Sequence, residues 1–115
     1  MYNDALKTIF ADVPEDLVAT QGPVSEPVAR ALAEGIRSRT GASLGISITG
    51  IAGPTPGTGP DAEKPIGLVY IAIADGKETR VKELHLPGDR DRIRWWASQH
   101  ALEMIRLMLI EQQSF

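Results

Sequence analysis

Ile66-Gly67-Leu68-Val69-Tyr70-Ile71-Ala72-Ile73-Ala74-Asp75-Gly76 is the stretch that decides the fold of this chain. Apolar side chains occupy nearly every position from Ile66 to Ala74, as expected for a strand that is covered on both faces. Asp75-Gly76 is a strong signal for a two-residue hairpin turn. The following segment, Glu78–Leu86, alternates imperfectly between apolar and solvated side chains, which is typical of an outer strand. The sequence therefore predicts a buried strand joined by a hairpin to an outer antiparallel strand.

Helices are predicted before and after this hairpin. Ser25 to Arg39 begins with a good N-cap residue, Ser25, and ends at a suitable stop, Gly41. Asp89 is a plausible N-cap for a last helix that runs to about Gln112. Short helical segments are expected at Asn3–Phe10 and Glu15–Gln21. The buried stripe of the last helix is predicted to consist of Ile93, Ala97, Ala101, Met104 and Met108.

A further strand is expected at Leu44–Thr49, where a β-branched run indicates burial. The segment Gly53–Pro65 is rich in proline and glycine, so it is expected to be a long loop. Helix, strand, loop, hairpin and helix together indicate an α/β fold. We expect a mixed sheet, in which Asp75-Gly76 requires at least one antiparallel pair.

Composition limits the function classes. The chain has 115 residues, 43% of them hydrophobic, and we interpret residues 1–115 as a single domain. It has no cysteine and a net charge of -3, which excludes thiolate chemistry and disfavours nucleic-acid binding through bulk charge. No window approaches the ~20 apolar residues of a membrane span. We expect a cytoplasmic protein without a cofactor or a metal, since His85 and His100 lack metal-ligand spacing.

The candidate site is the strand exit at Thr49-Gly50-Ile51-Ala52-Gly53. Glycines at such an exit let backbone N–H groups approach a ligand, and amides there can hold an oxyanion or a phosphate. The alternative is a tight turn whose glycines only satisfy backbone geometry. Arg90 is a second candidate because its guanidinium can bind a phosphate or carboxylate bidentately. The alternative for Arg90 is pairing with Asp89 or Asp91 on a solvated surface.

Four blocks of the sequence resemble a known family. Their order and spacing are similar to those of the CinA C-terminal domain, the nicotinamide mononucleotide amidohydrolase module of competence/damage-inducible proteins. This resemblance implies a three-layer α/β/α fold that hydrolyses the carboxamide of nicotinamide mononucleotide to nicotinate mononucleotide and ammonia. The blocks are Gly22-Pro23-Val24-Ser25-Glu26-Pro27-Val28-Ala29, Thr49-Gly50-Ile51-Ala52-Gly53-Pro54, Glu63-Lys64-Pro65-Ile66-Gly67-Leu68-Val69-Tyr70 and Gly88-Asp89-Arg90.

The resemblance also assigns roles to residues. Tyr2-Asn3-Asp4-Ala5-Leu6-Lys7 resembles a family segment that begins with a tyrosine and ends in a functional lysine. The implied catalytic residues are Tyr2, Lys7 and Thr49, with Lys7 as the base. Substrate binding is implied for Gly50, Ile51, Ala52, Gly53 and Arg90.

The family's nucleophilic serine lies in a motif upstream of the tyrosine-to-lysine segment, and we expect that part of the domain to be absent from this chain. Thr49 and Ser47 are weak substitutes for it as nucleophiles. We therefore expect an N-terminally truncated domain that is inactive alone and self-associates as a homo-oligomer through apolar surface left uncovered. The alternative hypothesis is a non-catalytic nucleotide-binding or oligomerisation module.

Overall fold

The computed structural model describes residues 13–113, so the helix expected at Asn3–Phe10 lies outside the described residues. The elements follow the expected order, and the predicted boundaries are confirmed to within about two residues. They are α2 (Glu15–Gln21), α3 (Glu26–Thr40), β1 (Gly45–Gly50), the short 3₁₀ helix η1 (Gly59–Asp61), β2 (Leu68–Ala74), β3 (Thr79–His85) and α4 (Arg90–Gln113).

The three strands form one sheet in the order β1-β2-β3. Both pairings are antiparallel, with Ser47 opposite Ala72 and Ile73 opposite Arg80. The expectation of a mixed sheet is wrong for residues 13–113. A parallel neighbour needs a crossover that carries the chain back to the starting edge of the sheet. The Pro/Gly-rich segment between β1 and β2 instead turns the chain back directly beside β1.

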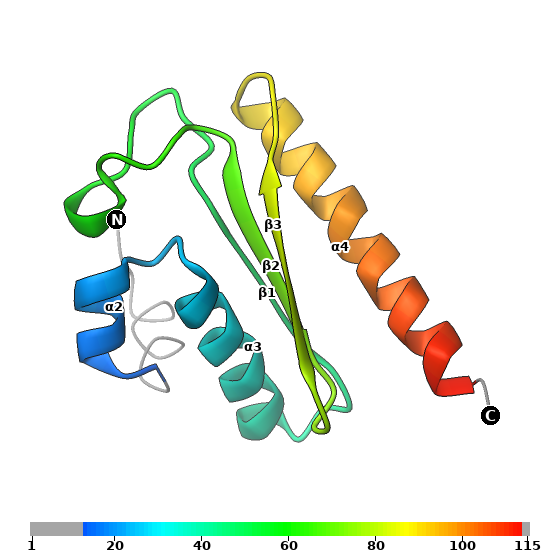
Figure 1. Ribbon diagram of the computed structural model, residues 1–115. Coiled ribbons are helices and arrows are strands. Elements are labelled where there is room, and N and C mark those ends of the chain that lie inside the picture. Colours follow the sequence, from blue (N-terminus) through cyan, green and yellow to red (C-terminus); the bar gives the residue numbers. More distant parts are fainter. Residues whose placement is uncertain (1–12, 114–115) are drawn as a thin grey trace.

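β2 is covered on both faces, as its apolar run predicts. On one face, Ala72 and Ala74 pack against Ala29 and Ala33 of α3. On the other face, Val69 and Ile71 pack in one cluster with residues of α4. Figure 1 shows α3 and α4 on opposite sides of the sheet, with α2 beside α3. The described part of the chain therefore has a helix layer, a sheet layer and a second helix layer.

Small side chains bring α3 close to the sheet. Ala29 and Ala33 are fully buried at this contact. The approach is close enough for the Ser47 hydroxyl on β1 to donate a 2.6 Å hydrogen bond to the main-chain oxygen of Ala29. Because Ser47 lies in the middle of a strand and is buried, this bond satisfies a hydroxyl that would otherwise destabilise the fold.

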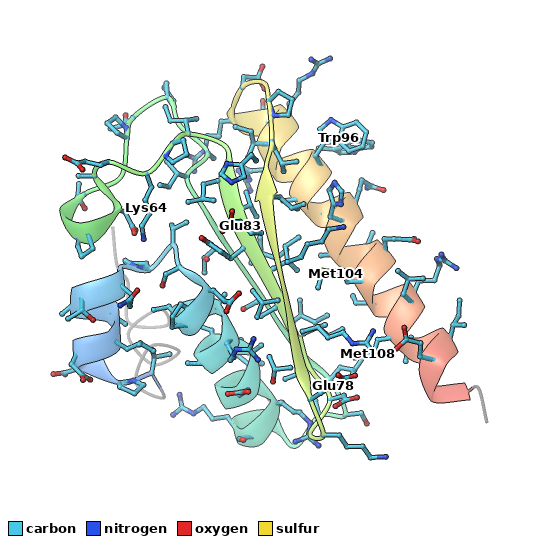
Figure 2. The ribbon with its side chains drawn as sticks, in the orientation of Figure 1. Lys64, Glu78, Glu83, Trp96, Met104 and Met108 are labelled. Atoms are coloured by element: carbon cyan, nitrogen blue, oxygen red, sulfur yellow. The ribbon has the colours of Figure 1, made fainter. Side chains whose placement is uncertain are left out.

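The last helix begins where the sequence predicts. The Arg92 amide donates to the Asp89 carboxylate at 2.9 Å, which is the N-cap contact expected of Asp89. Its buried stripe is confirmed, because Ile93, Ala97, Ala101 and Met108 are buried and Met104 is partly buried. In Figure 2, Met104 and Met108 point from α4 toward the sheet, whereas Trp96 lies on the outer side.

Two local expectations need correction. Ser25 occupies the N-cap position of α3 but makes no capping bond, because its hydroxyl donates to the Gly22 oxygen instead. The segment Leu44–Thr49 is a strand, but its expected burial is only half correct. Ile48 is 46% exposed, because β1 is an edge strand of the described sheet and α4 packs over β2 and β3.

Candidate functional site

The loop after β1 is held rigidly at its first residue. The Ile51 amide donates to the Leu68 oxygen at 2.9 Å, and the Gly67 amide donates to the Ile51 oxygen at 2.7 Å. Gly53 then turns with φ of 72°, and a Cβ at this position would lie 2.8 Å from Cγ2 of Ile66. Position 53 therefore requires glycine for two reasons, its positive φ and the lack of space for a Cβ atom beside Ile66. The loop leaves the sheet in one defined direction.

This geometry determines which amides are free for a ligand. The Ile51 amide is bound to β2, so it is not a donor to a ligand. Among the described residues, the amides of Ala52 and Gly53 have no hydrogen-bond acceptor. Strand amides alternate in direction, so the Gly50 amide points toward the free edge of β1. Within residues 13–113, the amides of this exit that remain unpaired are therefore those of Gly50, Ala52 and Gly53.

Arg90 reaches this loop from the start of α4. Its Nη1 donates to the Gly53 oxygen at 3.3 Å. Within residues 13–113, Arg90 forms no ion pair with Asp89 or Asp91, so the alternative of a solvated ion pair is not observed. The structure therefore brings together two of the predicted features, the Gly53 turn and the Arg90 guanidinium.

A groove of about 690 Å³ extends from this junction between β1 and α4. Its floor is apolar, and two guanidinium-bearing residues line its helical side. The lining residues are Ile48, Gly50, Ala52, Val69, Arg90, Ile93, Arg94, Ala97 and Ser98. Clefts with apolar walls and a few charged groups are typical of small-molecule sites. The groove is the candidate functional site.

Arg94 and Ser98 were missed by the sequence analysis. They follow Arg90 at intervals of four residues and line the same groove. The sequence pattern that could have identified them is the four-residue spacing of Arg90, Arg94 and Ser98, since residues four apart on a helix share one face. The Ser98 hydroxyl donates to the Arg94 main-chain oxygen at 3.0 Å. The Arg94 guanidinium has no hydrogen-bond or ion-pair partner within residues 13–113.

The predicted catalytic side chains are not all at this groove. Ser47 and Thr49 lie on the α3 face of β1, and the groove lies on the opposite face. The Thr49 hydroxyl is buried and has no hydrogen-bond partner among the described residues. Lys7 and Tyr2 lie outside the described residues. The structure therefore separates the Thr49 hydroxyl from Arg90.

A tyrosine and a glutamate form a polar pair beside Thr49. Tyr70, opposite Thr49 in the sheet, donates to Glu83 on β3 at 2.7 Å, and His85 lies 2.9 Å from the other Glu83 oxygen. Burial, reinforced by the Glu83 carboxylate, raises the pKa of Tyr70 to about 12. The hydrogen bond from Tyr70, followed by the contact with His85, lowers the pKa of Glu83. Tyr70 therefore remains a neutral donor across the physiological range.

No group of three or more histidine, aspartate or glutamate side chains within residues 13–113 is arranged to hold a metal ion. None of the helices in that same range combines the length and the hydropathy needed to cross a lipid bilayer.

Comparison with known proteins assigns the family. The model of the CinA C-terminal domain matches residues 1–109. The chain belongs to the CinA C-terminal domain family. A CinA-like protein of Koribacter versatilis (strain Ellin345) is 54% identical over 110 residues, which are 96% of this chain and 26% of that protein. The chain thus spans about a quarter of the length of the CinA-like relatives it matches.

Solved structures show the same fold. A CinA superfamily protein of Escherichia coli aligns with a TM-score of 0.80 and 27% identity, over 93% of this chain and 60% of that chain. The competence/damage inducible protein CihA of Agrobacterium tumefaciens aligns with a TM-score of 0.80 and 32% identity, over 93% of this chain and 64% of that chain. The α/β fold of this chain is therefore that of CinA structures.

The Tyr70 contact predicts an alkaline titration. The chain has two tyrosines, so in Tyr2→Phe the phenol absorbance reports Tyr70 alone. We expect this phenol to ionise near pH 12, and Glu83→Gln to lower that value. In the unfolded chain, Tyr70 ionises near its ordinary pKa of 10.0. The contribution of the Tyr70–Glu83 contact to the free energy of unfolding is therefore complete below pH 10 and is lost as the pH rises toward 12. Ionisation of Tyr70 near pH 10 in the folded chain would contradict the assignment.

Proposed function

We propose that the groove between β1 and α4 binds nicotinamide mononucleotide, as part of a domain that hydrolyses its carboxamide. In that reaction water adds to the amide carbonyl, ammonia leaves, and nicotinate mononucleotide is the product. The described residues bind and orient the nucleotide. None of the described residues places an activated nucleophile in the groove, so we expect the chain alone to bind the nucleotide without hydrolysing it.

The observation that carries this proposal is the junction of Gly53 and Arg90. Amide hydrolysis passes through a tetrahedral oxyanion, which is stabilised by fixed N–H donors. The free amides of Ala52 and Gly53 are such donors, and they are fixed because Ile51 is bonded to β2. A guanidinium at the same loop matches the phosphate of a mononucleotide, and Arg94 extends this positive side of the groove.

The expected lack of activity is supported by the two hydroxyl groups on β1 near the loop. A hydroxyl nucleophile needs an adjacent base. The Ser47 hydroxyl is hydrogen-bonded to the Ala29 oxygen, and the Thr49 hydroxyl is buried on the face away from the groove. Lys7 and Tyr2 remain the proposed catalytic pair, and Lys7 serves as a base only if burial or a nearby cation lowers its pKa.

Calorimetric titration with nicotinamide mononucleotide tests the binding role. We expect Arg90→Ala to weaken binding about tenfold, the equivalent of about 1.4 kcal/mol for a lost charged hydrogen bond. Arg92→Ala is the matched control, since Arg92 is an exposed arginine of the same turn that does not line the groove.

An unchanged affinity in Arg90→Ala, or an equal loss in Arg92→Ala, would remove Arg90 from the site. A wild-type chain that binds no nucleotide would contradict the proposal itself. Ammonia release by the chain alone would show that a nucleophile is present after all.

The second candidate function, assembly of copies, is favoured by the outer surface of α4. Trp95, Leu102 and Leu109 recur at intervals of seven residues and are 56%, 59% and 42% exposed. Apolar residues at this spacing form the seam of helix pairs. We define Trp95, Leu102 and Leu109 as the outer seam and propose that it pairs with the outer seam of a second copy. This role is compatible with nucleotide binding, because none of the three seam residues lines the groove.

Light scattering after size exclusion tests the assembly role. We expect the wild-type chain to have at least the mass of a dimer, and Leu102→Glu to reduce it to a monomer by placing a charge in the seam. Ala42→Glu adds the same charge at an exposed position in the turn between α3 and β1, away from α4, and serves as the control. A monomeric wild-type chain at hundreds of micromolar would reject self-association.

A further inference from the structure

A partly buried ion pair lies on the far side of the loop from Arg90. Lys64 Nζ donates to the Asp61 carboxylate at 2.7 Å, to the Gln21 oxygen at 2.7 Å and to the Val24 oxygen at 2.6 Å. An ammonium has three N–H groups, so every donor of Lys64 is used. Figure 2 shows Lys64 reaching from the loop toward the connection between α2 and α3.

The Asp61 side chain of this pair is 8% exposed. Its second carboxylate oxygen accepts from the Val24 amide at 3.3 Å. The backbone at Gly22 passes so close that a Cβ there would lie 2.1 Å from Asp61 Oδ1, and its φ of 82° also favours glycine. The Asp61 carboxylate is therefore enclosed by the chain segment before α3, whereas the Lys64 ammonium stays partly exposed.

Val24 connects the ion pair to the loop of residues 51–53 after β1, which we call the ligand loop. Its amide is held by Asp61 and its oxygen by Lys64, so both of its main-chain polar groups are fixed. Its side chain is buried in one cluster with Ile51 and Leu68. Ile51 is the residue that anchors the loop to β2 and precedes the free amides of Ala52 and Gly53.

We propose that Asp61 and Lys64 are positioning residues for the ligand loop. Their ion pair fixes Val24, and Val24 fixes Ile51 from the side opposite Arg90. The amides of Ala52 and Gly53 are thereby held in place before a ligand arrives, which reduces the entropy lost on binding. The part of this inference that concerns affinity rests on the proposed nucleotide-binding function.

Lys64→Met tests the proposal, because it retains the apolar stem and removes the ammonium. The Asp61 charge is then buried without its partner. We expect amide hydrogen exchange, measured by NMR, to become at least tenfold faster at Val24 and Ile51 in the folded variant. The Ile93 amide, which donates to the Asp89 oxygen in α4, is expected to keep its wild-type rate. Lys77→Met, at an exposed position in the hairpin turn, is the matched control and leaves all rates unchanged.

The second readout is the affinity for nicotinamide mononucleotide, which we expect to fall at least tenfold in Lys64→Met and to recover in part in Lys64→Arg. Faster exchange at all amides together, Ile93 included, would show a merely structural role and overturn the proposal. Unchanged exchange at Ile51 would overturn it as well.

If Lys64→Met does not fold, Asp61→Asn, which keeps the shape of the side chain, is judged by the same exchange criterion. If the wild-type chain binds no nucleotide, the proposed function fails, and the exchange data still decide whether the ion pair positions the loop.

Discussion

The burial of β2 between two helices is the constraint on which the rest of the structure depends. Ile71 is fully buried on the α4 face, and Ala72 is fully buried on the α3 face. The register of a strand that is covered on both faces is fixed, because a slip of one residue would move every side chain to the opposite face of the sheet. The sheet, both helix layers and the direction of every loop are set relative to this one strand.

The position of β2 determines the geometry of the candidate site. Ile51 is hydrogen-bonded to Leu68 at the start of β2, so the ligand loop begins at a fixed point. Ile93 packs in one cluster with Val69, which places the first turn of α4, and with it Arg90, beside the same loop. Groups from two distant parts of the sequence therefore meet at this junction. Such preorganisation is what an oxyanion or phosphate site requires.

The elements could be predicted from the sequence because each has a local signal. The apolar run of β2, the Asp75-Gly76 turn and the buried stripe of α4 all depend on neighbours in the chain. The sequence did not reveal which elements lie opposite one another, so the exposure of Ile48 and the antiparallel return after β1 were missed. The Asp61–Lys64 pair was missed for the same reason, since its acceptors at Gln21 and Val24 lie 43 and 40 positions away from Lys64.

Amide chemical-shift mapping of the ¹⁵N-labelled chain, as nicotinamide mononucleotide is added, tests nucleotide binding in the groove most directly. We expect the largest shifts at Gly50, Ala52 and Gly53, with smaller shifts along the first turns of α4. Shifts confined to the α3 face or to the hairpin at Asp75-Gly76 would contradict it. The absence of any shift at millimolar nucleotide would show that this groove is not a nucleotide site.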